Sequence, residues 1–387
     1  MSGLTGGIYV PLREYSGNTF FDKWDYAGHE DNTTWGNVTY VTRDVAMSSK
    51  LTFVNGDGHA IVRVDNTTTI APPAPGEFVH RNSVRITTQD TYGVGNLIMI
   101  DVHHLPWGCS VWPSFWTLGT QKEWPHGGEI DIIEGINKMN TNQMALHTDA
   151  GCAQSDPPGQ TGRTLEGDCS VDRGCIVQET KPNSFGDAFF GKGGGIWATQ
   201  IDVSGVYIWF WSRSDVPAFI ANATPDSTMD PSIWGPPSAA YPAKGCDISK
   251  FFTPQQLVLL TTLCGVWAGI PQLYSNTCPG SCVEDNIIGP GSPKYDDAYW
   301  DIAYIRTYIA QNSQPGASSL APTTANVNAN TQGANLATGI TASTTGASST
   351  SGRTTPSQSS SAAVHFNYFG SWPIGVLGML CILHGLF

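Results

Sequence analysis

Apolar and polar residues alternate with a period of two in short runs over most of residues 8 to 310. This alternation is typical of β-strands with one buried face, and no run of useful length has a helical period. The predicted strands are 51–54, 60–64, 83–87, 95–102, 142–148, 203–211, 257–263 and 299–309. Short strands without intervening helices predict an all-β sandwich. The length of the segment favours a β-jelly roll with long loops over an immunoglobulin-sized domain.

One segment departs from regular alternation, and it carries three acids. It runs His126-Gly127-Gly128-Glu129-Ile130-Asp131-Ile132-Ile133-Glu134-Gly135. On a strand, Glu129 and Asp131 share one face and the isoleucines between them point to the other. Regular alternation would put position 133 on the acidic face, but Glu134 comes one residue late. A β-bulge at Ile132–Ile133 would return Glu134 to the face of the other two acids.

Three carboxylates on one strand face could act as a catalytic set. Two Glu side chains that lean toward each other could approach the separation of a retaining glycosidase pair, about 5–5.5 Å. Glu129 would then attack the anomeric carbon and Glu134 would protonate the leaving oxygen. Asp131 could hydrogen-bond the nucleophile and help keep Glu134 protonated. An exposed acidic strand face and a calcium site of hard oxygen ligands are the alternatives.

Composition supports a turn-rich β protein and excludes one class of partner. Charged residues make up only 13% of the 387 residues, whereas Gly (43) and Pro (25) are abundant. The formal net charge is −13. Because a nucleic-acid site requires a basic face, we predict no nucleic-acid partner.

Cysteine usage and glycosylation motifs indicate an oxidising compartment. Eight of the nine cysteines precede residue 290, and they do not have the spacing of a zinc site. We therefore predict disulfides, with a connectivity that the sequence leaves open, and no metal. Acceptor sequons for N-glycosylation begin at Asn32, Asn37, Asn66 and Asn222.

The C-terminal part of the chain changes character twice. Residues 311–365 are rich in Ser, Thr, Ala, Gly and Asn and carry almost no charge, which predicts a disordered, O-glycosylated linker. Residues 366–387 are apolar and uncharged. They predict a GPI-anchor signal rather than a membrane helix, because cytoplasmic cations are missing. The start of the chain lacks the features of a signal peptide. We therefore expect a secreted, cell-surface or cell-wall protein whose N-terminus is truncated here.

Aromatic residues surround the acidic strand in the sequence. Trp112 and Trp116 precede it and would share a face of an extended segment, Trp124 leads into it, and Trp267 follows later. Sugar rings have apolar C–H faces that stack on aromatic rings, so these four are candidate substrate-binding residues. A core position is the alternative for each, because Trp is highly buried on average.

Two histidines are further candidates for substrate binding. His147 lies on the predicted strand after the acidic one, and His126 begins the acidic segment. His147 could hydrogen-bond the nucleophile or a sugar hydroxyl. A lone His on an apolar strand is more often structural, so this alternative stays open.

With these residues placed, the chain resembles glycoside hydrolase family 16, in its fungal laminarinase or endo-1,3(4)-β-glucanase group. Glu129–Glu134 matches the family's bulged ExDxxE signature. The other similar segments are Gly108–Trp116, Leu146–Thr148, Thr262–Gly269 and Ala298–Ile302. The resemblance covers roughly residues 12 to 309. It implies that residues 1–310 form a concanavalin-like jelly roll with a substrate cleft on its concave face.

The resemblance also implies roles for the three acids. Glu129 would be the nucleophile of a retaining mechanism, Glu134 the acid/base, and Asp131 their helper. The chain departs from the group's usual GDWAG at Val266, where the group has Asp, and lacks its usual Trp near residues 201–203. The change at Val266 could alter specificity or rate, but neither departure touches the three acids, so activity is expected to survive.

Three functions compete at this point. An endo-hydrolase of β-1,3- or mixed β-1,3/1,4-glucan leads, and it needs no cofactor. A cell-wall transglycosylase of the same family would use the same covalent intermediate, but such enzymes tend to have the unbulged ExDxE spacing. A catalytically silent carbohydrate-binding protein would be expected to lose one of the acids. We expect a monomer that binds β-glucan and reaches the membrane through its C-terminal lipid anchor.

Overall fold

The computed structural model describes residues 7 to 311. The predicted linker (311–365) and anchor signal (366–387) lie outside the described residues, apart from residue 311, so both stay predictions. Among the described residues, no helix is long and apolar enough to cross a membrane.

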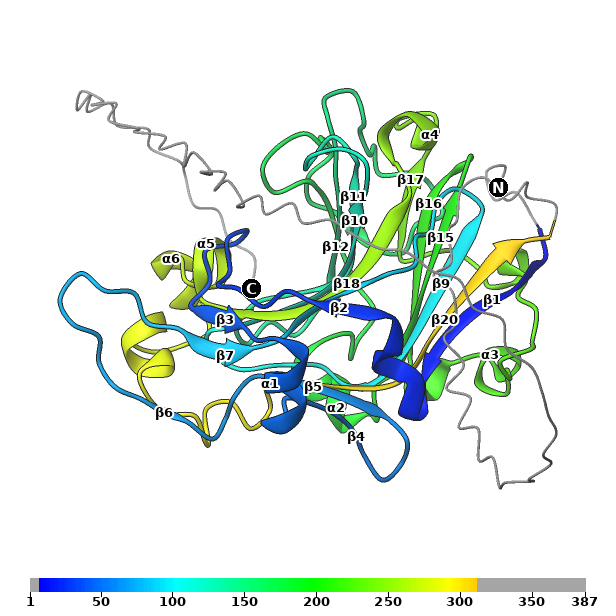
Figure 1. Cartoon of the computed structure of the whole chain (residues 1–387). Coiled ribbons are helices and arrows are strands. Elements are labelled where there is room, and N and C mark those ends of the chain that lie inside the picture. The colour runs from blue at the N-terminus through cyan, green and yellow to red at the C-terminus, as the bar shows by residue number, and fades with distance from the viewer. Residues whose placement is uncertain (1–6, 312–387) are drawn as a thin grey trace, which may run out of the picture. The chain divides into compact units, whose positions relative to one another are not determined.

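Two antiparallel sheets of eight strands each form the body of the described chain (Figure 1). The strands of the first sheet, in spatial order, are β17 (Ala239–Pro242), β16 (Gly205–Ser212), β15 (Gly195–Asp202), β9 (Asn96–His104), β20 (Tyr299–Ala310), β5 (Ala60–Arg63) and β4 (Thr52–Val54), with β1 (Tyr9–Ser16) paired to β20. Its longest pairing joins β9 to β20, so segments about 200 residues apart in sequence lie side by side.

The second sheet contains the acidic strand near its middle. In spatial order its strands are β13 (Arg163–Thr164), β14 (Cys175–Gln178), β12 (Gln143–His147), β11 (Glu129–Glu134), β10 (Val111–Gly119), β18 (Gln255–Leu263), β8 (Arg85–Thr88) and β2 (Trp24–Tyr26). Two small pairs complete the strands, β19 (Gly289–Pro290) with β6 (Thr69–Ile70) and β3 (Val38–Tyr40) with β7 (Arg81–Ser83).

Helices in the described part of the chain are short and lie in the connections. The α-helices are α1 (Arg43–Ser48), α2 (Gly186–Gly191), α3 (Ala218–Ala221), α4 (Ile248–Phe251), α5 (Gly265–Ala268) and α6 (Pro271–Tyr274). Short 3₁₀ helices span Gly17–Lys23, Arg213–Asp215 and Pro231–Ile233, and a π-helical turn spans Val283–Ile287. The expectation that residues 8 to 310 contain no long helix is confirmed.

The main hydrophobic core lies between the two sheets. Phe115 and Leu259 of the second sheet and Ile100, Trp197 and Phe210 of the first belong to one buried cluster. Burial of apolar surface stabilises a fold by about 25 cal/mol per Å². This layer is therefore the main source of stability. The predicted all-β sandwich is therefore confirmed.

Four disulfides join all eight cysteines that precede residue 290. The pairs are Cys109–Cys278, Cys152–Cys246, Cys169–Cys175 and Cys264–Cys282. The prediction of disulfides rather than metal ligation is confirmed for these cysteines. Three of the bridges close long loops, which removes conformational freedom from the unfolded chain.

Candidate active site

The acidic strand β11 contains the predicted bulge. Its neighbour β10 pairs Trp116 with Asp131 and Phe115 with Ile133, so Ile132 has no partner on that strand. The ladder to β12 is interrupted over the same residues. An extra residue in one strand, between two residues whose partners are consecutive in the other strand, is a β-bulge.

The register places all three acids on one face. Glu129, Asp131 and Glu134 oppose residues 118, 116 and 114 of β10, which are two apart and therefore share a face. The three isoleucines of β11 are all buried in the core between the sheets. The predicted common face is confirmed, and we call it the carboxylate face of the second sheet.

Asn142 stabilises the bulge from the neighbouring chain segment. Its side-chain carbonyl accepts a hydrogen bond from the backbone N–H of Glu134 (2.9 Å), and its amide donates to the carbonyl of Ile132 (2.8 Å). Asn142 is fully buried, and its own N–H donates to the hydroxyl of Ser184 (3.0 Å). A buried backbone group without a partner is unfavourable, so Asn142 replaces the ladder bonds that the bulge removes.

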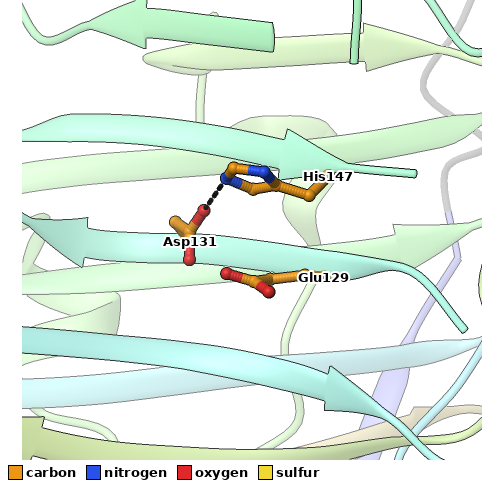
Figure 2. Close-up of side chains that lie close together, drawn as sticks. All are labelled: Glu129, Asp131 and His147. Carbon is orange, nitrogen blue, oxygen red and sulfur yellow. Dashed lines mark ion pairs between the residues drawn. The ribbon is translucent and has the colours of Figure 1, made fainter. Parts of the chain in front are cut away.

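Each acid has a nitrogen donor as its neighbour. The indole of Trp112 donates to Glu134 Oε1 (3.0 Å), and the indole of Trp124 donates to Glu129. His147 Nε2 lies 3.3 Å from Asp131 Oδ2. Figure 2 shows Glu129 and His147 on opposite sides of Asp131.

Burial and charge set the protonation of Glu134 and His147. Burial raises the pKa of Glu134 to about 7, against the opposing effects of the Trp112 hydrogen bond and the His147 charge. Burial alone would lower the pKa of His147, but the hydrogen bond to Asp131 and the charges of the three acids raise it to about 9. Near neutral pH His147 is therefore a cation, and Glu134 can exist as a proton donor.

Glu129 and Asp131 form a coupled pair. Burial and the charge of Asp131 raise the pKa of Glu129 well above its ordinary value. Burial and the charge of Glu134 raise that of Asp131. Because two close carboxylates resist double ionisation, the pair shares a proton over part of the pH range. Trp124 favours the ionised form of Glu129, and His147 favours that of Asp131.

The calcium alternative has a geometric basis at this cluster. Ligand atoms of Glu129, Asp131 and His147 all lie within 4.8 Å of one another. However, a hard cation prefers oxygen ligands, and His147 Nε2 already faces Asp131 Oδ2 at 3.3 Å. These observations favour a proton-transfer site over a metal site.

Besides Asp131 Oδ2, which contacts His147 Nε2 as an ion pair, two polar groups at the site are buried and have no hydrogen-bond partner among the described residues. They are the hydroxyl of Ser114, which stands directly opposite Glu134, and Nδ1 of His147. Such groups are uncommon in folded proteins and are available to a polar ligand. A hollow beside His147 is lined by Trp124, Pro125, His147, Thr148 and residues 169–172.

The predicted aromatic residues differ in their surroundings. The side chain of Trp124 is 53% exposed beside Glu129, so it can offer an open ring to a sugar. Trp112 is buried, and its ring meets that of Trp267 edge-on with centroids 5.3 Å apart. Trp116 is buried, and the guanidinium of Arg85 lies over its ring. These contacts give no support to its predicted role as a stacking platform, which stays a prediction.

The two candidate histidines also differ in their surroundings. His147 lies directly opposite Glu129 in the ladder and contacts Asp131, as a role at the site requires. His126 instead lies in the exposed turn before β11, where Nδ1 is 2.6 Å from Asp149. Its predicted contact with substrate stays a prediction.

The sequence did not point to Asn142 or to Ser114. Asn142 acts through two backbone groups on a neighbouring strand, and Ser114 faces Glu134 only because of the strand register. Both relations depend on which strands pair, and a single sequence contains no local signal for that.

An all-β sandwich with three acids on one face of a single strand fits a glycoside hydrolase. The model of the XgeA-like, catalytic GH16 domain matches residues 24–308. The chain therefore belongs to glycoside hydrolase family 16.

Curated relatives agree with this assignment. The chain is 36% identical to a probable glycosidase of Schizosaccharomyces pombe over 78% of this chain and 69% of that protein. It is also 36% identical to a probable endo-1,3(4)-β-glucanase of Aspergillus clavatus, over 82% of this chain but only 49% of that protein. The chain thus spans about half the length of this second relative.

Solved structures with the same fold include enzymes of two activities. Laminarinase 16A of Phanerochaete chrysosporium, solved with two β-glucans in its donor and acceptor sites, is 37% identical with a TM-score of 0.71. An elongating GH family 16 β-1,3-glucosyltransferase is 37% identical with a TM-score of 0.69. Each comparison covers 78% of this chain and 99% of the other.

We predict that the hydrogen bond from Trp112 to Glu134 limits activity at alkaline pH. Because that bond lowers the pKa of Glu134, the Trp112→Phe variant should raise it above the parent value of about 7. Activity that needs protonated Glu134 should then persist to higher pH, by about one pH unit. The pH profile of kcat tests this. An alkaline limb that stays in place or moves to lower pH would contradict it.

Glu134 should destabilise the fold at alkaline pH. A carboxyl whose pKa rises from 4.5 to about 7 on folding contributes stability below pH 4.5 that is lost as the pH rises through 7. Glu134→Gln should therefore raise the free energy of unfolding at pH 8 by at most about 3 kcal/mol and leave it unchanged at pH 4. Denaturant unfolding at both pH values measures this. Equal effects at the two values would contradict it.

Removal of the Asn142 side chain should misplace Glu134. Asn142→Ala leaves two buried backbone groups unpaired, so we expect a stability loss of about 2–4 kcal/mol and a fall in kcat with little change in KM. Asn96→Ala is the matched control, because Asn96 is equally buried and joins Gly93 to Tyr308 on the other sheet. The control should lose stability but keep kcat. Equal kcat values in both variants would remove the positioning role.

Proposed function

We propose that the chain is a retaining endo-glycosidase that hydrolyses β-1,3- or mixed β-1,3/1,4-glucan. The observation that carries the proposal is the bulged strand, which gives Glu129, Asp131 and Glu134 one common face. The family assignment and the names of the curated relatives agree with this substrate class. The structure of Laminarinase 16A with β-glucans bound supports it further.

The first step forms a covalent glycosyl-enzyme. A carboxylate oxygen of Glu129 attacks the anomeric carbon, and the bond from that carbon to the glycosidic oxygen breaks. Its electron pair goes to the oxygen, which takes the proton of Glu134. A pKa of about 7 lets Glu134 carry this proton in weakly acidic solution.

The second step hydrolyses the intermediate. Glu134, now ionised, accepts a proton from water, and the resulting hydroxide oxygen bonds to the anomeric carbon as the ester to Glu129 breaks. The free enzyme is then restored with Glu134 protonated. The anomeric configuration is retained because inversion occurs twice.

The remaining polar groups tune the nucleophile. A proton on Asp131 would let that residue donate a hydrogen bond to ionised Glu129. The Trp124 indole supplies a second donor. The cationic His147, on the other side of Asp131, limits the accumulation of negative charge that three close acids would otherwise produce.

Sugar transfer is the second candidate, and one comparison favours keeping it. The glucosyltransferase relative has the same fold and a similar degree of identity to this chain as the laminarinase. Transfer differs from hydrolysis only in the second step, where a sugar hydroxyl replaces water. The balance between the two depends on the acceptor side of the site.

We also propose that the protein is secreted, acts at the cell surface or wall, and is held there by a GPI anchor. Its four disulfides support an oxidising compartment. Among the four sequons, Asn32 and Asn222 are exposed, whereas the side-chain amides of Asn37 and Asn66 donate hydrogen bonds within the protein. Release from cells by a phosphatidylinositol-specific phospholipase would test the anchor.

The nucleophile variant tests the proposed chemistry. The full chain should release new reducing ends from laminarin or lichenan but not from chitin, and Glu129→Ala should lower kcat by several orders of magnitude because it loses the covalent route. Product analysis with a labelled acceptor oligosaccharide separates hydrolysis from transfer. If no glucan yields reducing ends or elongated acceptor, or if Glu129→Ala keeps near-native turnover, the proposal is wrong.

A further inference from the structure

Trp35 is an exposed aromatic residue that the catalytic steps do not use. It is 73% exposed, which makes it the most exposed tryptophan among the described residues. Its backbone has φ of 54°, in the left-handed region that bulky residues rarely adopt. Such backbone conformations persist only where the surrounding structure imposes them, and they cluster at binding sites.

The loop that carries Trp35 is held by one buried carboxylate. Asp31 Oδ1 accepts hydrogen bonds from the N–H and hydroxyl of Thr33 and from the N–H of Thr34, all at 3.0 Å. Its Oδ2 accepts from the Gly36 N–H (3.2 Å) and from the Thr262 hydroxyl (2.7 Å). Asp31 is only 6% exposed. The loop is therefore pre-organised, which lowers the entropy lost when a ligand binds.

The same loop borders the carboxylate face. Thr262 of β18 contacts Asp31 and lies directly opposite Trp112 of β10, whose indole donates to Glu134. Arg85 makes a second connection between the loop and this face, because it donates to the Thr33 hydroxyl (3.2 Å) and its guanidinium lies over the ring of Trp116. At about 4.8 Å per strand, the loop lies roughly 14 Å from the strand of Glu134.

Two glycines allow this close approach. A Cβ at Gly36 would lie 1.8 Å from the Thr262 hydroxyl, and a Cβ at Gly265 would lie 2.5 Å from the carbonyl of Thr34. That carbonyl accepts a hydrogen bond from the N–H of Val266 (2.9 Å). Val266 is itself 55% exposed and adjoins Trp267, the ring partner of Trp112. Apolar and aromatic groups thus continue from the acid/base to Trp35.

We propose that Trp35 is a distal binding platform for the glucan chain whose cleaved bond lies at Glu129 and Glu134. This inference rests on the proposed function. The occupant follows from continuity with the active site, because a polysaccharide that fills the carboxylate face extends beyond it. The C–H faces of its sugar rings stack on an exposed indole. Trp35 contributes affinity for long chains and takes no part in bond cleavage.

Chain-length dependence tests this proposal. The full chain with Glu129→Gln, which cannot turn over, is titrated with laminari-oligosaccharides of increasing length and with long laminarin. Trp35→Ala in this background should weaken binding of long chains by up to about tenfold and leave the shortest bound oligosaccharide unchanged. Trp35→Tyr should recover part of the loss. In the active enzyme, Trp35→Ala should raise KM for long laminarin and keep kcat.

The control variant is Phe219→Ala. Phe219 is also exposed (46%), but it lies on α3 beside Ile220, which packs on the outer face of the first sheet. The Phe219→Ala variant should bind every oligosaccharide with the same affinity as the parent. If Trp35→Ala and Phe219→Ala behave alike, or if Trp35→Ala weakens short and long chains equally, the platform is refuted.

Two further outcomes also decide the matter. Asn32, in a sequon next to this loop, could instead carry a glycan that covers Trp35. In that case Asn32→Gln would bind long laminarin more tightly than the parent while Trp35→Ala had no effect, which would refute the proposal for the glycosylated protein. If the parent binds no β-glucan of any length, the proposed function itself fails, whereas a failure of Trp35 alone leaves hydrolysis of short substrates intact.

Discussion

The single extra residue in β11 is the constraint on which the site depends. Without the bulge at Ile132, the strand would send Glu134 into the hydrophobic layer that now holds three isoleucines. Burial of an unpaired carboxylate there would be strongly unfavourable. The bulge is made tolerable by Asn142, which satisfies both backbone groups that the ladder loses. The position of Glu134 therefore depends on the bulge in β11 and on the side chain of Asn142, which compensates for the lost backbone hydrogen bonds.

Electrostatics at the site works against stability. Three acids on one strand face repel one another, and burial raises the pKa of each. The cation at His147 and the two indole donors offset part of this repulsion without removing it. Burial is the main reason that Glu134 has a pKa of about 7, so the property that would make it a useful acid is also a cost to the fold. The wide apolar layer between the sheets and the four disulfides supply stability elsewhere.

The sequence predicted those features that depend on residues close in the chain. The alternation of Glu129, Ile130 and Asp131, with Glu134 one step late, was sufficient to predict the strand, its bulge and its common face. The series of short strands without intervening helices predicted the sandwich, and the resemblance to a family agreed with it. Features that depend on strand pairing had no such signal in the sequence. The periodicity of Trp112 and Trp116 correctly placed them on one face, yet it could not reveal that Arg85, some 30 residues earlier in the sequence, covers one of them. Asn142 had no local signal for the same reason.

The register of the second sheet also explains how chemistry and recognition can be separated. Directly opposed residues form rows across the strands, and the row of Glu134 continues through Ser114 and Leu260 to Arg85. Arg85 then contacts the loop that holds Trp35. Because a sheet is stiff across its hydrogen-bonded strands, side chains along such a row keep fixed spacings over several strands. An extended polymer that crosses the strands can therefore meet reactive groups at one position and apolar platforms at others. A change at the distal loop would alter which chains bind without moving the carboxylates.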